Sequence, residues 1–70
     1  MNFNDLNAEI ARNNLSIPKL ANIIGISKKA MYSRMRGQID FSQSEIAKIS
    51  EVLNLSDDKI LAIFFARKVS

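Results

Sequence analysis

The residues best suited to chemistry are polar side chains that recur at helical spacing in the segment 27–36. Residues three and four positions apart are neighbours on a helix. This spacing predicts an apolar face with Met31 and Met35 and, opposite to it, a polar face. The polar face consists of Lys28, Lys29, Tyr32, Ser33 and Arg36. Because lysine and arginine donate hydrogen bonds to phosphates and to guanine O6 and N7, this face predicts contact with a nucleic acid.

Each of these side chains also has a simpler interpretation. Lys28 and Lys29 can serve solubility alone, and the ring of Tyr32 can pack on the domain surface. Arg36 can be present only because the helix dipole stabilises a positive charge near the C-terminal end of a helix. Arg34 lies nearer the buried edge of the same segment, so we expect it to pair with a carboxylate rather than with DNA. We expect Arg36, at the end of the segment, and Gln38, two residues beyond it, to contact phosphates.

The charges are unevenly distributed along the chain. The formal net charge is +3, but residues 16–38 contain five basic residues and no acidic one. Residues 39–66 contain five acidic residues and two basic ones. A basic block in a chain that is otherwise acidic on balance suits a protein that turns one face toward a polyanion, although a solvated basic surface has the same composition.

The composition excludes several classes of function. The 70 residues include no cysteine and no histidine, which excludes disulfides, thiolate or imidazole metal sites and catalysis by Ser-His-Asp or Cys-His groups. We expect no metal site, cofactor or small-molecule ligand. We also expect no catalytic residue, because so small a domain has little room for a pocket of several hundred Å³. No apolar run approaches the ~20 residues that cross a bilayer, and the first residues do not resemble a signal peptide, so we expect a cytoplasmic protein.

The elements that position the polar face are predicted to be five short helices in a single domain, residues 1–70. A first helix begins after Asn4, as its N-cap, and ends at Asn13–Asn14. A second has Ser16 or Ile17 as its cap, Pro18 in its first turn and Gly25 as its stop. A third begins after Ser27 and ends at Gly37. A fourth begins at the capping box of Ser42 and Glu45 and ends near Asn54, and a fifth follows Ser56 or Asp57.

The second and third predicted helices, joined through Gly25, describe a helix-turn-helix. The second helix of such a pair lies in a DNA major groove about 12 Å wide. It needs an apolar face that holds it on the domain and a polar face that reaches the bases. The segment 27–36 meets both needs and is the predicted recognition helix.

Two stretches carry a family resemblance: Leu20-Ala21-Asn22-Ile23-Ile24-Gly25-Ile26-Ser27 and Phe41-Ser42-Gln43-Ser44-Glu45-Ile46. Over residues 6–64 the chain resembles the Cro/CI-type helix-turn-helix family of phage repressors, especially small Cro-like regulators of phages of Gram-positive bacteria. The resemblance implies a λ-repressor-like all-α fold. It also implies a regulator, usually dimeric, that binds double-stranded operator DNA at a lysis–lysogeny switch. Such a protein acts in the cytoplasm of a bacterial host cell, on the nucleoid.

The resemblance also assigns residues by position. It implies base contacts by Lys28, Lys29, Tyr32 and Ser33, and phosphate contacts at the starts of two helices, by Ser16, Lys19, Ser42 and Gln43. One position departs from the family, because many members have a DNA-contacting glutamine where this chain has Ile17 and Pro18. That departure weakens the case for a side-chain contact at Ile17.

The last predicted helix is apolar almost all round, whereas a surface helix normally has an apolar stripe. We expect Ile60 and Phe64 to enter the core, which leaves Leu61, Phe65 and Val69 as an exposed protein interface unless the tail covers them. The partner is then a second copy on DNA or a phage repressor. The sequence therefore leaves two functions open: a DNA-binding regulator, or a modulator (antirepressor) that binds a CI-type repressor. An enzyme is the weakest hypothesis, although a Ser–Lys pair is not excluded by composition.

Overall fold

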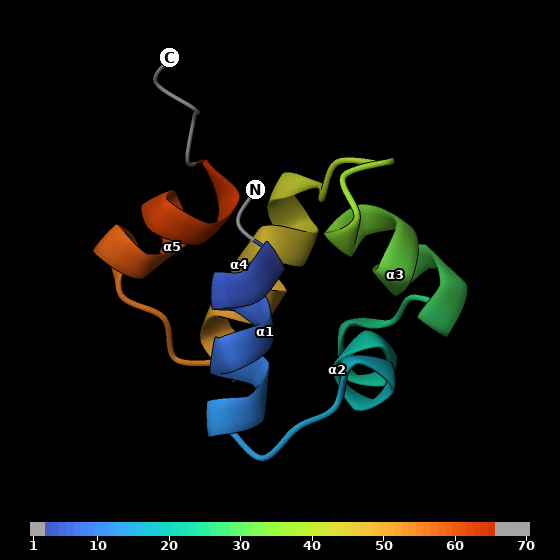
Figure 1. Ribbon diagram of the computed structural model, residues 1–70, viewed down its shortest axis with the longest axis horizontal. Helices are drawn as coiled ribbons and strands as arrows, with labels where there is room; N and C mark the ends of the chain where they lie inside the picture. The colour runs from blue at the N-terminus through green and yellow to red at the C-terminus, as the bar shows by residue number, and fades with distance from the viewer. Residues whose placement is uncertain (1–2, 66–70) are drawn as a thin grey trace.

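The computed structural model describes residues 3–65, and this part of the chain folds into five α-helices with no strand (Figure 1). The helices are α1 (Phe3–Arg12), α2 (Ile17–Ile24), α3 (Lys28–Met35), α4 (Gln43–Val52) and α5 (Asp57–Phe64). Helix α2 packs against α1, α3 and α4, whereas α5 packs against α1. The predicted all-α, five-helix architecture is confirmed. None of the helices in residues 3–65 is long and apolar enough to cross a membrane.

Four of the helices have a serine as their N-cap. The side-chain oxygen of Ser16, Ser27, Ser42 or Ser56 accepts a hydrogen bond from the backbone N–H three residues later, at 3.0–3.2 Å. The cap of α2 is therefore Ser16 rather than Ile17, and the cap of α5 is Ser56 rather than Asp57. The predicted capping box of Ser42 and Glu45 is present in full. These hydrogen bonds satisfy backbone donors that have no partner within the helix.

The predicted start of the first helix is wrong. Helix α1 already includes Phe3, so Asn4 lies inside its first turn and does not cap it. Asparagine is common at caps because its side chain can accept a backbone N–H, but here the helical backbone begins before that position. At the other end, Asn14 has a φ of 58°, which agrees with the predicted end at Asn13–Asn14.

Two glycines end the helices of the central pair. Gly25 follows α2 with a φ of 85°, and Gly37 follows the end of α3 with a φ of 81°. A side chain is strained in this left-handed conformation, whereas glycine adopts it without steric cost. The sharp turns that the sequence predicted at both positions are confirmed. The turn at Gly25 lets α2 and α3 pack against each other within a short stretch of chain, and the turn at Gly37 leads from α3 toward α4.

The core joins all five helices. Its buried apolar members are Leu6, Ile10, Leu20, Ala21, Ile24, Met31, Met35, Ile49, Leu53 and Ile63. Helix α5 thus inserts Ile63, which corrects the expectation for its neighbours: Ile60 is only half-buried, and Phe64 is half-buried at the core's edge. The reason is the rotation of α5 on α1, because the apolar run from Ile60 to Phe65 does not by itself select which side chain is buried.

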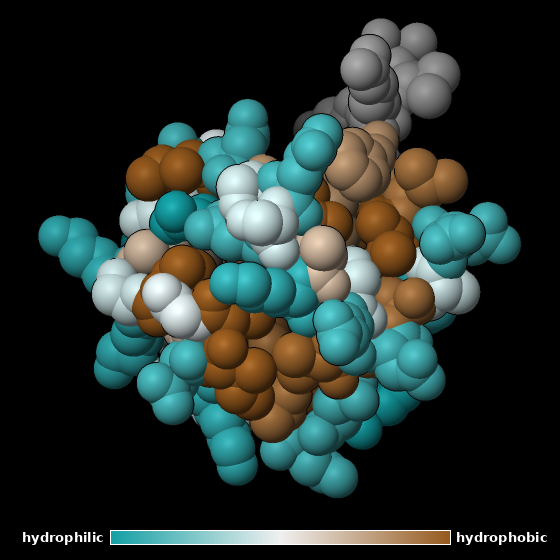
Figure 2. All heavy atoms as spheres, turned by 180° about the vertical axis from the view of Figure 1, so that it is seen from behind, coloured by the Kyte–Doolittle hydropathy of each residue, from teal (hydrophilic) through white to brown (hydrophobic). Residues whose placement is uncertain are grey.

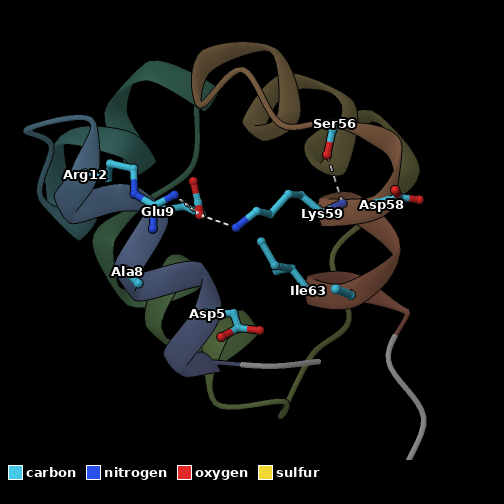
Figure 3. A pocket seen from close by; sticks show the side chains of 9 residues that line it. Asp5, Ala8, Glu9, Arg12, Ser56, Asp58, Lys59 and Ile63 are labelled. Atoms are coloured by element: carbon cyan, nitrogen blue, oxygen red, sulfur yellow. Dashed lines mark hydrogen bonds and ion pairs between the residues drawn. The ribbon is translucent and has the colours of Figure 1, made fainter.

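One charged residue in the described part of the chain is buried, and it ties α5 to α1. The Oε2 atom of Glu9 accepts hydrogen bonds from Arg12 at 2.9 Å and from the Nζ of Lys59 at 3.1 Å (Figure 3). Beside these residues lies a hollow of about 380 Å³ between the two helices, lined by Ala8, Ala62 and Ile63 among others. The expectation that so small a domain has little room for a pocket of several hundred Å³ is wrong.

Candidate nucleic-acid interface

The outer face of α3 presents the predicted base-contacting residues at different depths. Lys28 and Lys29 are exposed at the start of the helix, whereas Tyr32 and Ser33 are half-buried. The opposite face is fixed, because Met31 and Met35 are 0% and 1% exposed. The hydroxyl of Ser27 accepts the N–H of Ala30 at 3.0 Å and so holds the first turn. The helix therefore combines a firmly held apolar side with two lysines that extend from its front end.

Arg36 and Tyr32 lie together at the other end of this face. The guanidinium carbon of Arg36 is 5.9 Å from the centre of the Tyr32 ring, within the range of a cation–π contact. The tyrosine ring is thus partly covered by the arginine, in line with the simpler interpretation that it packs on the domain surface. Arg36 itself is exposed, and Gln38 two residues later is exposed as well.

Arg34 is directed away from the polar face. Its Nε donates to the Oε1 of Glu45 at 2.9 Å, and its Nη1 donates to the carbonyl oxygen of Ala30 at 3.2 Å. The expectation that Arg34 pairs with a carboxylate is confirmed. The other four basic residues of the segment 16–38 form no ion pair with any residue in the range 3–65: Lys19, Lys28, Lys29 and Arg36. All four are exposed, so they are available to an anionic partner.

Glu45 joins the end of α3 to the start of α4. Its Oε1 accepts both the N–H of Ser42, at 3.0 Å, and the Nε of Arg34, at 2.9 Å. Burial, which leaves the Glu45 side chain 14% exposed, raises the pKa of its carboxyl group. The hydrogen bond from Ser42 and the hydrogen bond and charge of Arg34 outweigh that effect, so the net pKa lies below the ordinary value of 4.5.

This lowered pKa predicts a loss of stability in acid. A carboxyl group whose pKa is lower in the folded than in the unfolded chain contributes its full stabilisation above the unfolded value and loses it as the pH falls through the folded one. We therefore expect the thermal midpoint, measured by circular dichroism, to fall as the pH drops below about 4.5. In Glu45→Gln the midpoint should be lower at neutral pH and depend less on pH in this window. An equally steep acid dependence in both proteins would contradict the assignment.

The starts of α2 and α4 differ in what they can offer a phosphate. In α2, Pro18 has no N–H and the N–H of Lys19 is bonded to Ser16. In α4, the N–H groups of Ser42 and Glu45 are used by the capping box, which leaves those of Gln43 and Ser44 at the front of the helix. Because free N–H groups at a helix start favour anions, α4 offers two adjacent donors and α2 relies more on the Lys19 side chain.

The predicted protein interface lies elsewhere. Leu61 of α5 is 58% exposed and Phe65, directly after the helix, is 54% exposed, so within residues 3–65 both side chains are uncovered. Val69 lies outside the described residues. Figure 2 shows apolar side chains at the surface on the side where α5 lies. In Figure 1 α5 and the pair α2–α3 stand on opposite sides of α1.

The comparisons with known proteins gave one family. A family model described as the BetR domain matches residues 7–67, which includes all five helices except the first turn of α1. Searches of the curated proteins and of the solved structures returned no significant match. The matched range contains every predicted DNA-contacting residue.

Proposed function

This chain belongs to the BetR domain family, and from that premise we propose that it is a sequence-specific, DNA-binding transcriptional regulator whose helix α3 enters the major groove. The observation that carries the proposal is the front of α3, where Lys28 and Lys29 are exposed without an ion pair in the described structure. Lysine at this place donates to guanine O6 and N7 or to phosphate. The proposal includes binding and no catalysis.

The proposed contacts fall into two groups. Lys28, Lys29, Tyr32 and Ser33 face the bases; the phosphates are contacted by Ser16, Lys19, Arg36, Gln38, Ser42 and Gln43. Phosphate contacts set the position of the protein on the duplex, whereas base contacts select the sequence. The Leu20–Ser27 motif further favours a Cro-like repressor of a phage lysis–lysogeny switch, acting on double-stranded operator DNA in the cytoplasm of a bacterial host cell.

The proposal is tested by binding to DNA that flanks the protein's own gene. In fluorescence anisotropy, we expect such fragments to bind more tightly than random DNA of equal length at about 150 mM salt. Affinity should fall with salt at a log–log slope of about −0.9 for each phosphate neutralised, or up to about −3.6 per copy if Lys19, Lys28, Lys29 and Arg36 all contact phosphates. Equal affinity for flanking and random DNA would refute sequence-specific binding.

A second candidate function is favoured by the exposed Leu61 and Phe65. Uncovered apolar side chains on a small domain mark protein interfaces, so the chain can instead act as an antirepressor that binds a CI-type phage repressor. Light scattering of the two purified proteins, with and without operator DNA, separates these functions. A mixed complex that forms without DNA supports the antirepressor, whereas a protein that binds the operator and stays apart from the repressor supports the regulator.

A further inference from the structure

Two arginines near the end of α3 are held in different ways. Arg34 is paired with an acid, because its Nε donates to the carboxylate of Glu45 at 2.9 Å. Arg36 lies against an aromatic ring instead, with its guanidinium carbon 5.9 Å from the centre of the Tyr32 ring. It forms no ion pair with any residue in the described part of the chain. A ring attracts a cation through its quadrupole and carries no net charge. Arg36 is therefore held in place with its positive charge not neutralised.

The backbone around Arg36 is fixed as well. Arg36 is the C-cap of α3, and its N–H donates to the carbonyl oxygen of Tyr32 at 3.0 Å. The next two N–H groups, of Gly37 and Gln38, donate to carbonyl oxygens of the last turn at 3.1 and 3.0 Å. Side chains on a helix lean toward its N-terminus, and residues four apart are neighbours. The Arg36 side chain thus folds back over Tyr32 instead of extending past the end of α3.

A phosphate near the end of α3 needs a cation in a fixed place. The last carbonyl groups of a helix carry partial negative charge, which repels an anion. A guanidinium has several N–H donors, and the face of a ring, unlike a carboxylate, does not occupy them with an oxygen acceptor. A long side chain loses rotamer freedom when it binds, and one that is already oriented loses less. The ring of Tyr32 therefore prepares Arg36 for an anion where the helix end itself disfavours one.

We infer that Tyr32 is a positioning residue, whose ring orients Arg36 to contact a DNA phosphate beside the bases that α3 reads. The inference rests on the proposed function, in which Arg36 contacts a phosphate and Tyr32 faces a base. It gives the two parts of the tyrosine different roles: the ring acts on Arg36, and the hydroxyl remains for the base. Because a phosphate contact carries no sequence information, the role of the ring extends to DNA of any sequence.

A double-mutant cycle, measured by fluorescence anisotropy, tests the ring separately from the hydroxyl. In the wild type, Arg36→Ala should weaken DNA binding. In Tyr32→Leu, which has no ring, the same substitution should cost about two- to fivefold less affinity, the factor that a cation–π contact contributes. In Tyr32→Phe, which keeps the ring, it should cost as much as in the wild type. A ring that only packs on the domain contributes equally with and without Arg36, so additive losses would overturn the inference.

The salt dependence of binding gives a second readout, because Tyr32→Leu removes no charge. Its log–log slope should nonetheless be shallower than that of the wild type, by up to the value of about 0.9 that belongs to one phosphate contact. Tyr32→Phe should keep the wild-type slope. Leucine favours a helix at least as well as tyrosine, and Tyr32 is only half-buried, so the circular dichroism of both variants should remain helical. Equal slopes in these two variants would contradict a role of the ring.

The same cycle on random DNA separates this inference from the proposed function. We expect equal coupling between Tyr32 and Arg36 on random DNA and on the fragment that flanks the gene, because both have the same backbone. Coupling confined to the flanking fragment would show that Arg36 reads a base and would overturn the phosphate contact. A wild type that binds both DNAs equally, with the coupling intact, would overturn sequence-specific binding and support the positioning role.

Discussion

Replacing Lys28 and Lys29 together by alanine is expected to lower the affinity for operator DNA by at least about thirtyfold. A specific side-chain contact to a base is worth about 1–3 kcal/mol, so two of them give a loss of at least about 2 kcal/mol. Both lysines are exposed at the front of α3, and neither contributes to the core. The preference for operator over random DNA should shrink as well, because base contacts select the sequence while phosphate contacts do not.

The control for this loss is Lys48→Ala on α4, which removes one exposed positive charge outside the proposed contacts. At fixed salt concentration, the single variants Lys28→Ala and Lys29→Ala should each bind more weakly than Lys48→Ala in fluorescence anisotropy. The circular dichroism of all three should match that of the wild type. If the three single variants lose the same affinity, the lysines of α3 act only through net charge, and a base-reading role for them is wrong.

Replacing Met31 by alanine is expected to unfold much of the protein at physiological temperature. Met31 is 0% exposed and lies on the face of α3 that packs into the core. Truncation of a buried methionine to alanine costs about 2–5 kcal/mol, because apolar contacts are lost and a cavity remains. A domain of this size has a total stability of only about 3.5–10 kcal/mol. One buried side chain therefore accounts for a large share of the stability that holds the recognition helix in place.

Urea unfolding measures this effect, with Ile23→Ala as the control. Ile23 is 49% exposed on α2, so the same kind of truncation there should cost well under 1 kcal/mol. If Met31→Ala loses no more stability than Ile23→Ala, then α3 is not anchored as the structure describes. A variant of Met31 that unfolds should also lose DNA binding, which distinguishes it from the lysine variants that stay folded.

The features that the sequence predicted correctly are local ones. Ser27 and Ser42 begin helices because a serine hydroxyl reaches the N–H three residues later, and both partners lie in one short segment. Gly25 and Gly37 end helices because of their own backbone freedom. Such features need no knowledge of the rest of the fold. For Arg34 the sequence predicted a carboxylate partner from its place near the buried edge of its helix, but the structure was needed to identify that partner as Glu45 on α4.

The features that the sequence missed depend on contacts between distant segments. Glu9 bonds to Lys59, fifty residues later in the chain, and nothing near either residue indicates the other. The burial of Ile63 instead of Ile60 follows from the rotation of α5 on α1, which a nearly uniform apolar helix does not determine. Phe3, Phe41 and Phe65 come from three separate parts of the chain and line two pockets that share Gly37, at the turn after α3. Only the packed structure brings these residues together.

The proposed position of α3 in the major groove is tested most directly by methylation of guanine N7 with dimethyl sulfate. The N7 atom lies in the major groove, so the reagent reaches it only from there. With protein bound to a fragment that flanks its own gene, we predict that a small set of guanines is protected from methylation. The same guanines should lose their protection in the Lys28→Ala/Lys29→Ala variant at a concentration where DNA is still bound. Bound DNA whose guanine N7 atoms all remain as reactive as in free DNA would contradict the claim.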